Sequence, residues 1–176
     1  MTYDIDNWPF SLIDWLWFND SGIPTRERLW QVLPKLDENT AWLFACTCAT
    51  DALWTAIEAP DTRSESAIDV AQLHAIFGGE IVDDDLYEAW LDARAAVRRT
   101  PAILHEQLAA RAAARVAEIK PYEQPWMVAW SVSRMSAQAI ALATTPIEMS
   151  DQERAEKWAN IWTKQADALV ELIEAE

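Results

Sequence analysis

Glycine is scarce in this sequence. It occurs three times, at Gly22, Gly78 and Gly79, whereas an average chain of this length carries about twelve. Tight hairpin turns depend on glycine, so an architecture built from short strands and turns is disfavoured. Alanine, leucine, glutamate and arginine dominate the middle and the end of the chain, and these residues lose least on entering a helix. The composition therefore predicts helices throughout.

Residues that ligate metals or attack substrates are also few. The two histidines, His74 and His105, stand on separate predicted helices, with no CxxC or HExxH sequence beside them. Cys46 and Cys48 would point about 200° away from each other on a helix, so a mutual disulfide is excluded. No glycine-rich phosphate loop or nucleophile elbow is present. We predict no catalytic residue, no metal and no cofactor, and a structural role for both thiols.

Long apolar runs and targeting segments are missing. No stretch approaches the roughly 20 apolar residues that span a membrane. The opening residues 1–4 lack the basic start and apolar core of a signal peptide. We therefore expect a soluble protein of the reducing cytoplasm that has no membrane partner.

Positive charge is the last shortage. Fourteen basic residues face 29 acidic ones, and the net charge of −15 disfavours direct binding to nucleic acid phosphates. Residues 1–88 hold seventeen acids and four bases, net −13, while residues 89–176 hold twelve acids and ten bases, net −2. Within 89–134, seven bases outnumber four acids. We expect an acidic side and a near-neutral side.

Helical periodicity, by contrast, is abundant. We predict an all-α fold, a single-domain bundle of about seven or eight helices joined by short loops, covering residues 1–176. The segment 38–59 is apolar on several faces, which is typical of a helix at the centre of a bundle. The predicted helical segments are 9–19, 25–33, 38–59, 65–77, 83–99, 101–119, 126–145 and 150–175.

Local signals mark several helix ends. Thr100 followed by Pro101 has the form of an N-cap before a proline at the first helical position. Ser150 with Glu153 has the form of a capping box, and it opens an amphipathic helix over residues 150–175. Residues 1–36 form a tryptophan-rich segment that we expect to dock on the body of the domain.

Tryptophan is unusually frequent, with eleven in 176 residues. Tryptophan supplies large core contacts and also the anchors of interface hot spots, and we expect most of these side chains in the core. Trp15 and Trp17 cannot share one face of a helix. The amino-terminal segment is therefore expected to bury one ring and leave one for a partner.

Two charged groups have competing interpretations. The triplet 83–85 can cap a helix and complement its dipole, whereas a calcium loop would need spaced ligands that are missing. Two arginine pairs with i,i+4 spacing, Arg94 with Arg98 and Arg111 with Arg115, lie on alanine-rich predicted helices. They are either a solvated face or a patch for an acidic or phosphorylated partner.

The middle of the chain resembles a known family. Four features carry the resemblance: the run AWLFACTCA at 41–49, the loop at 61–63 that leads into Ala67 and Ile68, the turn at 79–81, and the alanine and arginine runs at 93–96 and 109–115. Over about residues 41–140 it resembles a bacterial immunity protein family of small, alanine-rich helical proteins. Ser64 stands where the family has proline, and the family's histidines near the end of this region are unmatched. The resemblance implies a non-enzymatic protein that neutralises a toxin.

These observations lead to one main functional hypothesis and two alternatives. We expect an acidic protein-binding inhibitor, of immunity type, that masks a basic surface of a toxin or effector. A phage or mobile-element anti-defence inhibitor that mimics nucleic acid is the first alternative. An enzyme or small-ligand carrier with an aromatic pocket is the second, with His74, His105 and Arg134 as its candidates. The expected partner-binding residues are Glu80, Asp83, Asp84, Asp85, Glu88, Trp15 and Trp17.

Overall fold

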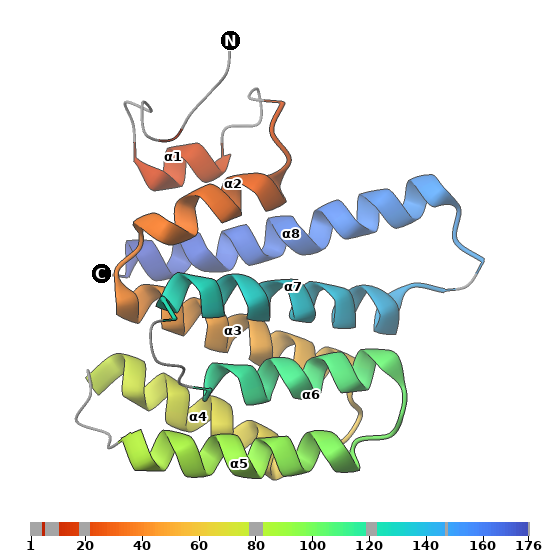
Figure 1. The fold of residues 1–176 in the computed structure, drawn as a ribbon. Helices are drawn as coiled ribbons and strands as arrows, with labels where there is room; N and C mark the ends of the chain where they lie inside the picture. Colours follow the sequence, from red (N-terminus) through yellow and green to blue (C-terminus); the bar gives the residue numbers. More distant parts are fainter. Residues whose placement is uncertain are drawn as a thin grey trace.

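The all-α prediction is confirmed by the computed structural model (Figure 1). The structure describes residues 5, 11–17, 22–77, 83–118, 123–146 and 148–175. Within these ranges there are eight α-helices, a short 3-10 helix and no strand. The elements are α1 (Leu12–Trp17), α2 (Thr25–Val32), η3 (Leu33–Lys35), α3 (Glu38–Ala56), α4 (Thr62–Phe77), α5 (Asp83–Arg99), α6 (Leu104–Val116), α7 (Pro125–Thr144) and α8 (Asp151–Glu174).

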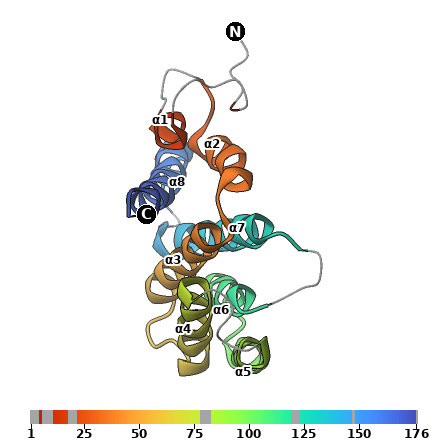
Figure 2. The same ribbon diagram turned by 90° about the vertical axis from the view of Figure 1, so that its left-hand side faces the viewer.

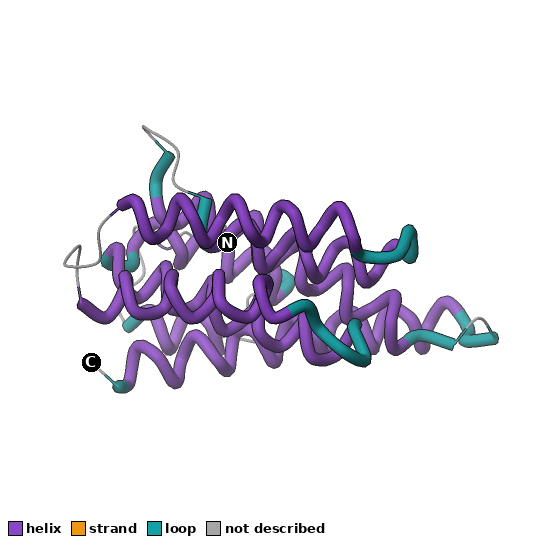
Figure 3. Tube along the Cα trace, turned by 90° about the horizontal axis from the view of Figure 1, so that it is seen from below, coloured by secondary structure: helices purple, strands orange, loops and turns teal. Residues whose placement is uncertain are grey.

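The helices are stacked in layers, with α3 and α7 at the centre (Figures 1 and 2). On one side of this pair lie α4 and α6, with α5 beyond them; on the other side lie α8 and the short helices α1 and α2. The long helices run side by side, so most connections lie at the ends of the bundle (Figure 3). None of the described helices is long and apolar enough to cross a membrane.

Helix α3 occupies the centre because it is apolar around most of its circumference. Its buried side chains include Trp42, Phe44, Cys46 and Leu53. A helix with this pattern gains burial only when neighbours cover several faces, and α4, α6, α7 and α8 all contact it. Trp54 is the exception, because its side chain is 61% exposed.

Some predicted helix ends are confirmed and one is wrong. Ser150 and Glu153 form the predicted capping box, and α7 begins at Pro125, one residue before the predicted start. Thr100 does not cap α6, because its hydroxyl donates back to the carbonyl oxygen of Ala96 and closes α5. Helix α6 begins four residues later, at Leu104.

The amino-terminal helices dock on α8. Trp15 and Leu16 of α1 are buried, at 0% and 2% exposure. Below them, five tryptophans form a chain of ring contacts between α2, α7 and α8, with centroids 5.1–5.8 Å apart: Trp126, Trp30, Trp130, Trp162 and Trp158. The guanidinium carbon of Arg26 lies 5.9 Å and 6.0 Å from two of these rings. Aromatic contacts therefore join α2 to α7 and α8, which lie far from it in the sequence.

Candidate functional sites

The predicted partner-binding residues fall into two separate places. Asp84, Asp85 and Glu88 are exposed at the start of α5, where Asp83 is the first helical residue, and Glu80 lies outside the described residues. Trp15 is fully buried, so its ring cannot contact a partner in this conformation; Trp17 is 49% exposed. Helices α1 and α5 lie at opposite ends of the stack (Figure 1). One compact partner cannot cover both sets.

The closed end of the α4–α5 hairpin exposes apolar side chains among the carboxylates. The last two turns of α4 and the first three turns of α5 carry five such side chains, each 44–57% exposed: Leu73, Ile76, Phe77, Tyr87 and Leu91. Because α4 ends where the hairpin turns and α5 begins there, these side chains lie on adjoining helices. We name them, together with Asp84, Asp85 and Glu88, the hairpin surface.

A second feature lies between α5, α6 and α7. A cavity of about 420 Å³ is lined by all four arginines of the two predicted pairs, Arg94, Arg98, Arg111 and Arg115. The remaining lining residues are Trp90, Val97, Ala114, Glu118, Ser131 and Met135. We name this cavity the arginine groove. The arginines predicted to form either a patch or a solvated face therefore converge on one cavity.

Two of the groove arginines are held in place by their neighbours. Arg115 is largely buried and pairs with Glu118, at 3.1 Å, and with Glu123. The guanidinium carbon of Arg94 lies 4.7 Å from the centroid of the Trp90 ring, a cation–π contact. Such contacts fix the direction of a long side chain and reduce the entropy lost when a ligand binds.

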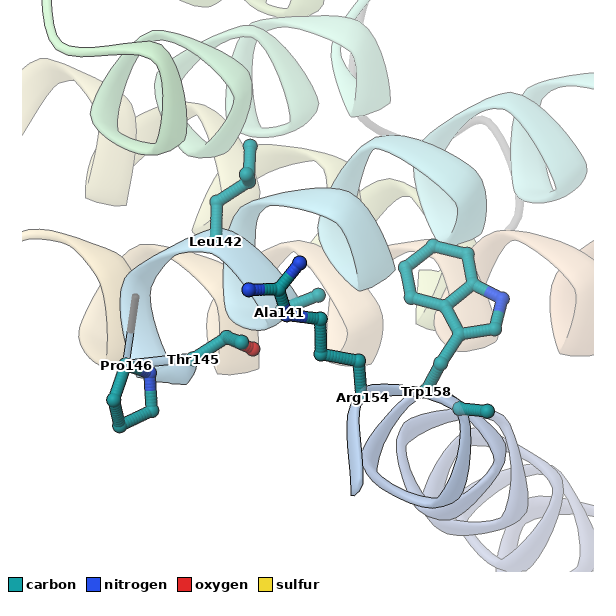
Figure 4. Close-up of a pocket in the computed structure, with 7 residues that line it drawn as sticks. Ala141, Leu142, Thr145, Pro146, Arg154 and Trp158 are labelled. Atoms are coloured by element: carbon teal, nitrogen blue, oxygen red, sulfur yellow. The ribbon is translucent and has the colours of Figure 1, made fainter. Parts of the chain in front are cut away.

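A second cavity lies between the end of α7 and the start of α8 (Figure 4). Its volume is about 550 Å³, and its apolar lining includes Leu142, Pro146 and Trp158. Arg154 rises from α8 towards Ala141 and is its one cation among the lining residues. The cavity is mostly apolar, so it suits an uncharged body more than a polyvalent anion.

The cysteines lie beside a third cavity but are buried. Cys46 and Cys48 are 1% and 2% exposed, and they line a space of about 550 Å³ between α3, α4 and α8. Burial raises the pKa of the Cys46 thiol to about 12, with a further contribution from the charge of Asp69. Burial also raises the pKa of the Cys48 thiol. Both thiols are therefore protonated at neutral pH, and a protonated thiol is a poor nucleophile.

The candidates for an enzymatic or carrier pocket do not converge. His74 lies near the end of α4 and His105 at the start of α6, and these two helix ends lie at opposite ends of the bundle (Figure 1). Neither histidine lines any of the three cavities above, and the same is true of the exposed Arg134. In the part of the chain that the structure describes, no group of three His, Cys, Asp or Glu side chains is placed to hold a metal ion.

Comparison with known proteins identifies no relative: no family model, no curated protein and no solved structure matches the chain.

Sequence reasoning missed the apolar part of the hairpin surface. The buried face of α4 includes Ile68, Ala71 and Ala75, which are spaced three and four residues apart. Leu73, Ile76 and Phe77 fall off that stripe, yet they are as apolar as a second buried face would be. These apolar residues outside the buried face could have predicted an exposed apolar surface on this helix.

Proposed function

We propose that this protein is a non-enzymatic inhibitor of immunity type, which binds a toxin or effector protein and masks a basic surface on it. The observation that carries this proposal is the hairpin surface, where α4 and α5 expose five apolar side chains and α5 adds three exposed carboxylates. The resemblance of residues 41–140 to the bacterial immunity protein family points in the same direction.

The apolar side chains of the hairpin surface favour a protein as the partner. Monomeric proteins rarely expose contiguous apolar patches of more than a few hundred Å², and patches above that size mark interaction sites. Phe77 and Tyr87 are 55% and 57% exposed, and aromatic rings of this kind are enriched among the residues that dominate binding energy. A partner that covered both rings would remove most of their remaining apolar area from water.

The carboxylates of the hairpin surface specify the charge of the partner. Asp84, Asp85 and Glu88 are exposed and place negative charge near the apolar side chains, in a chain whose net charge is −15. A basic partner is drawn to such a surface, because opposite charges steer encounter and raise the association rate. The complementary surface is therefore basic at its edge and apolar at its centre.

The test is an affinity capture from host lysate at moderate and at high salt, with matched variants. The test variant carries Phe77→Ser and Tyr87→Ser in the hairpin surface. The control carries Trp54→Ser and Leu104→Ser, which remove one aromatic and one aliphatic side chain at 61% and 63% exposure elsewhere. The captured protein is then purified, and its activity is assayed with and without this chain.

The proposal predicts that the wild type and the control capture a basic protein at moderate salt and that the test variant does not. The captured protein should be inhibited in the complex. A nuclease or defence complex in the place of a toxin would assign the chain to the anti-defence alternative. Capture that is equal for the test variant and the control, or a partner that stays fully active when bound, would contradict the proposal.

A further inference from the structure

The arginine groove concentrates positive charge in a chain that is otherwise strongly acidic. The four guanidinium groups come from two helices, α5 and α6, while α7 closes the groove with Ser131 and Met135. Helices α6 and α7 together contain a single acidic residue, Glu106, and it does not line the groove. The groove therefore has a local charge opposite to that of the whole molecule.

Three of the four arginines make no ion pair within the described part of the chain: Arg94, Arg98 and Arg111. The chain has 29 carboxylates for 14 bases, so carboxylates are not in short supply. Like charges gathered at one cavity repel one another, and a bound anion would relieve that repulsion. The lone carboxylate in the lining, Glu118, is already paired with Arg115.

We infer that the arginine groove is a binding site for a small organic phosphate, that is, a phosphate monoester on an apolar or aromatic body. This inference does not depend on the hairpin surface or on the proposed inhibitor role. The site combines unpaired guanidinium groups with apolar walls in one cavity of ligand size.

The guanidinium groups match the phosphate. A phosphate monoester carries about −1.5 to −2 charges at pH 7, and its oxygens accept paired hydrogen bonds from the planar guanidinium fork. Arg98 and Arg111 are exposed and make no ion pair with any described residue, so they can turn onto such a ligand. Arg115 is neutralised and fixed by its two carboxylate partners, so it shapes the groove and leaves Arg94, Arg98 and Arg111 to supply the positive charge.

The walls and the volume of the groove match the organic body. Trp90, Val97 and Met135 line it with apolar surface, and Arg94 presents a guanidinium plane against the tryptophan ring. Ligand cavities in proteins enclose about 300–1,000 Å³, and the 420 Å³ of the groove lies in this range. A compact monoester fits this space, whereas a polynucleotide is repelled by the net charge of the chain.

The experiment uses phenyl phosphate as the probe, with phenol and inorganic phosphate as its two halves. Binding is measured by calorimetry and by the NMR signals of the arginine Nε–Hε groups. Phenyl phosphate should bind saturably and shift the signals of Arg98 and Arg111; phenol should not bind. Adenosine monophosphate and a phosphotyrosine peptide, titrated in parallel, show by their relative affinity whether a free nucleotide or a protein side chain is the better source of the phosphate.

Matched variants locate the site. The pair Arg98→Gln and Arg111→Gln should weaken phenyl phosphate binding by about tenfold or more, because charge-assisted hydrogen bonds are lost. The control pair, Arg99→Gln and Arg134→Gln, removes the same charge from exposed arginines outside the lining and should leave the affinity unchanged. All four side chains are exposed, so both pairs should fold.

Three outcomes would overturn the inference. The first is no saturable binding of phenyl phosphate at millimolar concentration. The second is an equal loss of affinity in the control pair, which would mean that only the overall charge matters. The third is binding of inorganic phosphate as tight as that of phenyl phosphate, which would remove the organic body from the ligand.

Discussion

Replacing Ser133 with alanine should destabilise the fold through a buried hydrogen bond between α7 and α8. The Ser133 hydroxyl donates to the Gln165 side-chain oxygen at 2.8 Å, and the Gln165 amide donates to the Ser133 carbonyl oxygen at 3.1 Å. Both residues are buried, at 0% and 4% exposure. The pair therefore joins α8 to the centre of the bundle where little water can replace either group.

The size of the effect follows from what each change leaves behind. Ser133→Ala leaves the Gln165 oxygen buried without this donor, and an unsatisfied buried group costs about 1–3 kcal/mol. Gln165→Leu removes both hydrogen bonds and strands the Ser133 hydroxyl, at a similar cost. The double variant removes both polar partners together, so it should cost less than the sum of the single changes by about 1–2 kcal/mol.

The assay is guanidinium unfolding followed by far-ultraviolet circular dichroism, with a double-mutant cycle across the two positions. In a separate thermal scan, each kcal/mol lost should lower the melting temperature by about 2–4 °C for a chain of this size. An unchanged denaturant slope would show that the variants lower stability without altering the folded state. If the costs of the single changes add to within about 0.5 kcal/mol in the double variant, the reasoning is refuted.

Three further predictions concern other parts of the chain. Arg63 hydrogen-bonds to Asp61 and lowers the pKa of that carboxyl from 3.8 to about 2. Asp61→Asn should therefore reduce stability above pH about 4, and the difference from wild type should vanish as the pH falls through about 2, as unfolding at stepped pH would show. The native protein should resist thiol labelling at neutral pH, because burial raises the Cys46 pKa to about 12, and denaturant should restore labelling. Trp15→Ala should cost about 3–5 kcal/mol and Trp17→Ala much less, since the first ring is 0% exposed and the second 49%; equal losses in chemical unfolding would contradict the assigned burial.

Helix content was predictable from the sequence because local chemistry determines it. Ser150 and Glu153 satisfy each other's backbone groups within one turn, and Pro125 is preorganised for a first helical position, so neither signal needs distant partners. The start of α6 was not predictable in this way. The Gln107 side chain, in α6, donates to the carbonyl oxygens of Val97, Thr100 and Pro101. These hydrogen bonds hold the end of α5 and the α5–α6 connection against α6.

The two candidate sites were predictable to different degrees. The excess of bases within residues 89–134 pointed to the arginine groove, because i,i+4 spacing already places each pair on one face of a helix. Trp90 and Met135 could not be assigned to the same cavity, since that depends on how α5 and α7 approach each other. The exposure of Phe77 likewise depends on which helix covers α4. Hydrophobic periodicity predicts the apolar faces of a helix but not which other helices pack against them.

The docking of α1 and α2 on α8 has a consequence for synthesis on the ribosome. Residues 18–150 separate α1 from α8, so at about 5–20 residues per second the docking helix is completed on the order of 10 s after α1 has been made. During that interval α1 lacks its contact with α8, and α2 alone is available to cover Trp15 and Leu16. The nascent chain therefore exposes the apolar side chains of α1 until α8 has been made. Chaperones that recognise short apolar stretches would bind this segment early in synthesis.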